Sequence, residues 1–108
     1  MRAAVLHQPK DLKIMDIPER EVGPHEVKIR VKSVGICGTD VLVYEGSVHS
    51  KPPVVLGHEF AGVVVETGPE VKRLKAGDRV SGRGSWECGE CDGCRSASRH
   101  CEIGRAHV

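Results

Sequence analysis

The sequence has few aromatic residues and almost no excess of either charge. Its 108 residues contain one Trp, one Tyr and one Phe, and 16 basic side chains stand against 15 acidic ones. A nucleic-acid-binding domain usually concentrates Lys and Arg on one face, so this balance, without a long run of like charge, argues against a nucleic-acid partner. A chain of this length has room for one modest domain.

Long apolar runs are also missing. The apolar run at residues 3–6 is too short for a signal peptide, and no segment approaches the roughly 20 apolar residues that a membrane helix needs. We therefore expect a cytoplasmic protein without a membrane partner. In that reducing compartment, the five cysteines are better explained as metal ligands than as disulfides.

Short apolar segments separated by Gly and Pro predict a mainly β fold. Strand character is found at residues 3–6, 12–17, 27–34, 60–67 and 78–81, and residues 39–44 fit a short helix capped by Thr39. Many short strands with such turns are typical of a sandwich or barrel, so we expect an irregular antiparallel β-barrel. The sequence has no G-x-G-x-x-G segment and therefore no sign of a Rossmann domain.

Residues 82–101 form a segment rich in Gly, Ser, Cys and charge, which we call the zinc lobe. Its cysteines have the spacing Cys-x2-Cys-x2-Cys-x6-Cys and are Cys88, Cys91, Cys94 and Cys101. Four thiolates would close the tetrahedral shell of one Zn²⁺ ion and leave no position for a substrate, so this site would be structural. The alternatives are free thiols or an iron–sulfur cluster. A ferredoxin motif, however, continues after its third Cys with three residues, a Cys and a Pro, whereas six residues separate Cys94 from Cys101 here.

Cys37, His58 and Glu59 form a second candidate metal site. Cys37 and His58 each stand beside glycines at the end of a predicted strand, and such ends can bring side chains together over a pocket. Their spacing alone says little, because a lone Cys or His is usually a packing residue. The assignment therefore depends on the sequence around them.

Four motifs stand in the order found in the zinc-dependent medium-chain alcohol dehydrogenase family, which the chain resembles. They are residues 34–40 (VGICGTD), residues 57–71 (GHE-x2-G-x5-G-x2-V), residues 77–80 (GDRV) and the zinc lobe. The resemblance covers residues 1–101, and residues 81–84 (SGRG) are most similar to threonine and polyol dehydrogenases.

The resemblance implies a GroES-like barrel with a catalytic zinc held by Cys37 and His58. Glu59 would be a further or alternating ligand, and the remaining ligand would lie beyond residue 108. The implied enzyme oxidises a secondary alcohol or polyol through a zinc alkoxide that transfers hydride to NAD or NADP. It would be a homodimer or homotetramer with a small-molecule substrate.

The resemblance also implies roles for two neighbouring residues. Thr39 would pass the hydroxyl proton toward the cofactor, and Asp40 would orient His58 by accepting its other ring hydrogen. Many family members have a His five residues after the ligand Cys, where this chain has Leu42. Proton exit would then use water, with His49 and Tyr44 as nearby candidates.

We expect the chain to be the N-terminal part of a longer enzyme and to be inactive alone. Residues 102–108 have the sequence EIGRAHV, which the DNA GAG-ATC-GGA-AGA-GCA-CAC-GTC would encode. That DNA is similar to a common sequencing adapter, so we expect these residues to be a non-biological tail. The alternative from another functional class is a stand-alone zinc-binding module without activity. A zinc-free reductase of the same superfamily would lack both metal sites.

Overall fold

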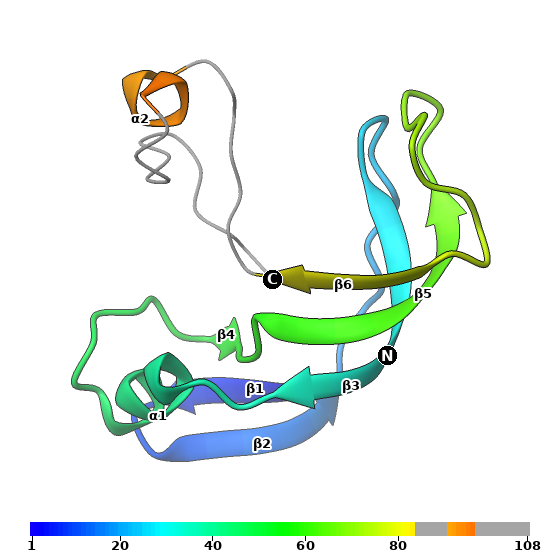
Figure 1. Ribbon diagram of the computed structural model, residues 1–108. Helices are drawn as coiled ribbons and strands as arrows, with labels where there is room; N and C mark the ends of the chain where they lie inside the picture. Colours follow the sequence, from blue (N-terminus) through cyan, green and yellow to red (C-terminus); the bar gives the residue numbers. More distant parts are fainter. Residues whose placement is uncertain (84–90, 97–108) are drawn as a thin grey trace.

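The computed structural model describes residues 1–83 and 91–96, and these residues form a mainly β structure. The strands are β1 (Arg2–Gln8), β2 (Asp11–Asp16), β3 (Val27–Gly35), β4 (Val54–Val55), β5 (Glu59–Thr67) and β6 (Arg79–Arg83), and the helices are α1 (Gly38–Glu45) and α2 (Asp92–Arg95). They build two three-stranded antiparallel sheets, with the strand orders β2-β1-β4 and β3-β5-β6 (Figure 1). The predicted mainly β, antiparallel fold class is confirmed.

All five predicted strand segments are strands, with ends that move by at most two residues. Two short elements were not predicted: β4, which pairs with β1 through Val54 and Val55, and α2. The prediction that Thr39 caps the first helix is wrong, because α1 begins at Gly38 with Cys37 as its N-cap. Within residues 1–83 and 91–96, no helix is long and apolar enough to cross a membrane.

The core of the described residues is small and centred on the middle strand of each sheet. Leu6 on β1 is fully buried and Val64 on β5 is 1% exposed. Ala3, Val5 and Cys91 complete the buried apolar set, and none of the described polar or charged side chains is buried. In contrast, Ile14, Val34 and Ile36 are more than half exposed, so much apolar surface lies open to solvent.

A tight turn of residues 75–78 comes directly before β6, at the end of the connection from β5. The backbone N–H of Asp78 donates to the Lys75 carbonyl at 3.1 Å, and Gly77 between them has a φ of 95°. An i to i+3 bond with a positive φ at the third residue is typical of a type II turn, which favours glycine there. Hydrogen bonds of 2.8 and 2.9 Å tie Gly77 and Asp78 to the buried Val64.

The Asp78 carboxylate closes this turn. It accepts hydrogen bonds from the Lys75 backbone N–H at 3.0 Å and from Lys75 Nζ at 3.1 Å. The backbone bond first, and then the ammonium group, hold the pKa of Asp78 below its ordinary value of 3.8. The carboxylate therefore favours the folded state while it is ionised.

Asp78→Asn is expected to reduce stability near neutral pH but not in strong acid. Because the folded-state pKa is lowered, the contribution is complete above the unfolded value of 3.8 and is lost as pH falls through the folded value. Denaturant unfolding of wild type and variant, from neutral pH down into strong acid, measures this difference. Lys75→Met, which keeps the backbone bond, should show a smaller loss. A pH-independent difference for Asp78→Asn would contradict the assignment.

Candidate metal centre

Helix α1 follows β3 almost directly, and this junction fixes the position of Cys37. Cys37 has extended backbone angles, φ −86° and ψ 156°, as an N-cap residue should. Asp40, three residues later, reaches back so that its Oδ2 accepts the Cys37 backbone N–H at 2.9 Å. This is one half of a capping box, and the negative charge in the first turn also suits the helix dipole.

The pairing of β3 with β5 brings a second segment beside this junction. Gly35, at the end of β3, pairs with Glu59, the first residue of β5. Cys37 follows the end of one strand and His58 precedes the start of the other, so the two residues meet although they are 21 positions apart. The sheet register therefore determines which side chains gather here.

The donor atoms of Cys37, His58 and Glu59 all lie within 4.8 Å of one another. We call these three residues the donor cluster. Cys37 and His58 are half-buried and Glu59 is exposed. The structure thus gathers the three residues proposed from the sequence, and their role as metal ligands stays a prediction.

Thr39 and Asp40 connect the members of the cluster. The Thr39 hydroxyl donates to Cys37 Sγ at 3.0 Å and lies 3.4 Å from His58 Nε2. Asp40 Oδ1 lies 3.3 Å from His58 Nδ1, while the other oxygen of the same carboxylate holds the Cys37 backbone. The Asp40 side chain is only 13% exposed, so one shielded carboxylate orients two candidate ligands.

The hydrogen bonds around Cys37 and His58 change the acidity of both side chains. The pKa of the Cys37 thiol is lowered, first by the Thr39 hydroxyl, then by the Thr39 backbone and His58. The pKa of His58 is raised, first by its hydrogen bond with Cys37, and the nearby negative charge of Asp40 adds to this. The lowered pKa of Cys37 favours a thiolate, which is the form of cysteine that binds metals.

The donor set fits zinc. Thiolate sulfur, imidazole nitrogen and carboxylate oxygen are the ligand types that zinc takes from proteins, whereas magnesium and calcium prefer oxygen alone. Ligand atoms in a tetrahedral zinc shell lie about 3.5 Å apart, given bond lengths of about 2.0 to 2.3 Å. The donor atoms of the cluster lie within 4.8 Å of one another, which is wider than that spacing, so the side chains would have to move closer together to bind one ion.

Only part of the zinc lobe falls within the described residues. Cys91 is buried and is the N-cap of α2, and Cys94 is half-buried on the same short helix. Cys88 and Cys101 lie outside the described residues, as do residues 102–108. The four-thiolate site therefore stays a prediction.

Tyr44, named from the sequence as a candidate for proton exit, is hydrogen-bonded to the backbone of Lys10, and its role in proton exit stays a prediction. Its hydroxyl donates to the Lys10 carbonyl at 3.4 Å, and the Lys10 backbone N–H donates to the Tyr44 carbonyl at 2.7 Å. These bonds attach the C-terminal end of α1 to the turn between β1 and β2. Sequence reasoning missed this attachment, because nothing in the sequence relates the turn at Pro9 to the helix end at Gly46.

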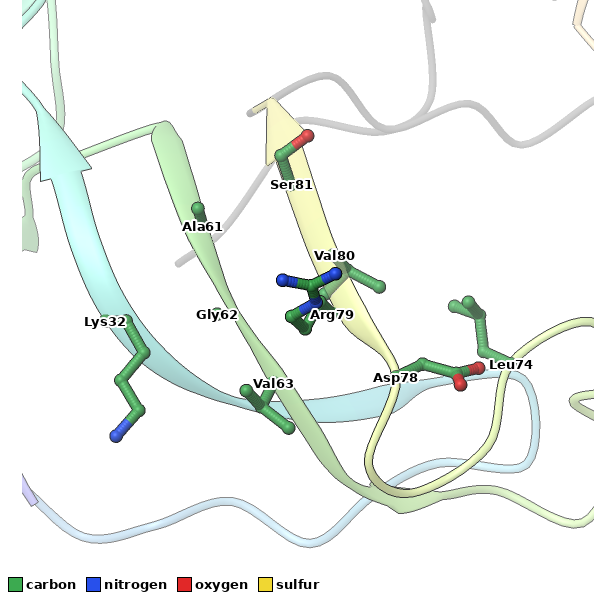
Figure 2. Close-up of a pocket in the computed structure, with 9 residues that line it drawn as sticks. All are labelled: Lys32, Ala61, Gly62, Val63, Leu74, Asp78, Arg79, Val80 and Ser81. Carbon is green, nitrogen blue, oxygen red and sulfur yellow. The ribbon is translucent and has the colours of Figure 1, made fainter.

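The β3-β5-β6 sheet also carries a wide hollow of about 730 Å³ (Figure 2). The residues that line it are Lys32, Ala61, Gly62, Val63, Leu74, Asp78, Arg79, Val80 and Ser81. None of them belongs to the donor cluster. The candidate metal centre is therefore separate from this hollow.

Comparison with known proteins decides the family. The sequence profile of the alcohol dehydrogenase GroES-like domain matches residues 23–107. The chain belongs to this family. The resemblance seen in the sequence and the GroES-like fold are both confirmed.

Individual proteins similar to this chain are dehydrogenases, in agreement with the family match. The L-threonine 3-dehydrogenase of Streptomyces avermitilis is 50% identical over 81% of the chain. A zinc-dependent alcohol dehydrogenase of Streptococcus pneumoniae matches with a TM-score of 0.86 and 30% identity over 100% of this chain and 32% of its own. A protein described as a zinc-binding dehydrogenase, from Sinorhizobium meliloti and bound to NADP, has a TM-score of 0.87 and 36% identity over 97% of this chain and 31% of its own. The GroES-like chain spans 27% of the Streptomyces relative.

Asp40→Ala is expected to destabilise the fold by about 1 kcal/mol, the usual cost of losing a helix-cap interaction. Asp40→Asn keeps an oxygen that can accept the Cys37 N–H and should lose clearly less. Free energies of unfolding from denaturant titration at neutral pH measure both variants. Equal losses in the two variants would show that the cap contact contributes little.

Proposed function

We propose that this chain provides the zinc-binding part of an NAD- or NADP-linked dehydrogenase that oxidises a secondary alcohol or polyol. The observation that carries the proposal is the donor cluster, in which sulfur, nitrogen and oxygen ligand atoms lie within 4.8 Å of one another where the β3–β5 pair ends. The L-threonine 3-dehydrogenase and the zinc-dependent alcohol dehydrogenase among the relatives support it.

Cys37 and His58 would hold the catalytic zinc, with Glu59 as a further or alternating ligand. When bound there, zinc supplies a Lewis acid that lowers the pKa of an alcohol hydroxyl. Asp40 keeps the His58 ring oriented through Nδ1, so that Nε2 is the nitrogen left for the metal. The same carboxylate fixes the backbone that carries the Cys37 sulfur.

Thr39 would receive the proton that leaves the substrate hydroxyl. Thr39 is exposed, and its hydroxyl lies beside both Cys37 Sγ and His58 Nε2, so it adjoins the donor cluster. Because Leu42 stands where many family members have a relay His, the proton would pass on to water. The nicotinamide cofactor would bind outside the residues of this chain.

The zinc lobe would hold a second zinc ion with a structural role. Cys88, Cys91, Cys94 and Cys101 would supply four thiolates, and metal binding would then contribute directly to the folding of this glycine-rich segment. Such a closed shell binds no substrate. The two proposed sites thus have different roles: the donor cluster would take part in the reaction, and the zinc lobe would stabilise the fold.

The purified chain is expected to bind two equivalents of zinc, measured by elemental analysis after dialysis. Cys37→Ser and His58→Ala should each lose one equivalent and keep the other. His7→Ala is the matched control, because His7 lies on β1 and contacts Met15 Sδ on β2, and it should keep both. Unchanged zinc content in Cys37→Ser and His58→Ala would refute the catalytic site.

Activity is tested in a longer polypeptide. The chain would replace the corresponding residues of the Streptomyces avermitilis L-threonine 3-dehydrogenase, and cofactor reduction would be followed with a panel of secondary alcohols and polyols. The chimera should turn over at least one of them, and its His58→Ala form should not. A folded, zinc-loaded chimera that is inactive on the whole panel would contradict the proposed reaction.

A further inference from the structure

Gly35 lies directly opposite Glu59 in the β3–β5 pair. Opposite side chains in an antiparallel sheet ordinarily have Cβ atoms about 4.5 to 5.5 Å apart. A Cβ atom placed on Gly35 would lie only 3.4 Å from Glu59 Cβ and 3.1 Å from Glu59 Oε2. The Glu59 side chain therefore leans across the space that a side chain at position 35 would occupy.

The Glu59 side chain has different contacts from those of the other two members of the donor cluster. Asp40 and Thr39 contact Cys37 and His58 through hydrogen bonds, whereas the Glu59 side chain is exposed and lies against the bare backbone of Gly35. The Glu59 side chain thus lies in space that a side chain at Gly35 would enter, while its carboxylate is within 4.8 Å of the sulfur and imidazole.

We propose that Gly35 is a positioning residue for the Glu59 carboxylate, which it admits to the metal centre by having no side chain. This inference rests on the proposed function, because it gives the Glu59 carboxylate a place in a zinc site. It predicts that a side chain at position 35 weakens metal binding without touching any donor atom.

The contacts at Gly35 also predict that this effect is separable from folding. The atom nearest to an added Cβ is Oε2, the end of a flexible side chain, so the carboxylate can move aside while the strands keep their places. An Ala would shift the carboxylate by a few tenths of an ångström. A Val, which suits a strand, would fill the space more completely.

The test is a zinc titration of the full chain, followed by NMR through the ring resonances of His58, which report on this site alone. Gly35→Ala should raise the dissociation constant slightly, and Gly35→Val should raise it by about 10-fold or more, the usual cost of misplacing a group that supports a metal site. Thermal unfolding confirms that each variant is folded. If Gly35→Val does not fold, Gly35→Ala carries the test.

Two controls distinguish a positioning role of Gly35 from a general effect of adding a side chain near the donor cluster. Gly38→Ala is the matched glycine substitution, since Gly38 adjoins Cys37 and an added Cβ there meets nothing within 4 Å. It should leave zinc affinity unchanged. In a Glu59→Ala background, substitution of Gly35 should have no further effect, because the group it positions is gone.

The outcomes distinguish this inference from the proposed function. If zinc leaves the His58 resonances of the wild type unchanged, the metal centre itself is refuted. If the wild type binds zinc and the Gly35 variants bind equally well, or weaken equally with and without Glu59, the positioning role is wrong. Weakening that disappears in the Glu59→Ala background supports it.

Discussion

Antiparallel pairing of β3 with β5 sets the position of every member of the donor cluster. The ladder runs from Val27 opposite Thr67 to Gly35 opposite Glu59, and its register shifts at two places between these pairs. Because side chains alternate between the faces of a strand, a slip of one residue would turn Glu59 to the other face. The cluster is thus a property of the sheet register, and local sequence near Cys37 or His58 could not create it alone.

Within this arrangement, the Asp40 carboxylate reconciles two demands. The N-cap of α1 needs an acceptor for a backbone N–H, and a metal-binding histidine needs an acceptor for its second ring nitrogen. Asp40 meets both with its two oxygens, and it is shielded enough for these contacts to be strong. Helix start and ligand orientation are therefore coupled through one side chain.

The sequence predicted the long elements well, since apolar runs such as residues 60–67 have enough length to show a pattern. It could not predict β4, whose two residues carry no periodicity and which exists only through its pairing with β1. The cap was misassigned to Thr39 because hydroxyl residues are the usual caps, although Asp40 three residues after Cys37 was a visible signal.

Part of the candidate site, too, was predictable from the sequence and part was not. Cys37, His58 and Glu59 were found through their motifs, because their spacing in the sequence carries no geometric information. The relation of Gly35 to Glu59 depends on which residues face each other across two strands, and a single sequence does not contain that register. Glycine at position 35 could equally have marked a turn.

Both ends of α1 are attached, and this links the donor cluster to a distant turn. The N-terminal end of the helix carries Cys37, and its C-terminal end is hydrogen-bonded to Lys10 in the turn between β1 and β2. An eight-residue helix is about 12 Å long and nearly rigid. A change in the β1–β2 turn that shifts this helix would therefore also shift the Cys37 sulfur, so the geometry of the donor cluster depends on a turn that contributes none of its atoms.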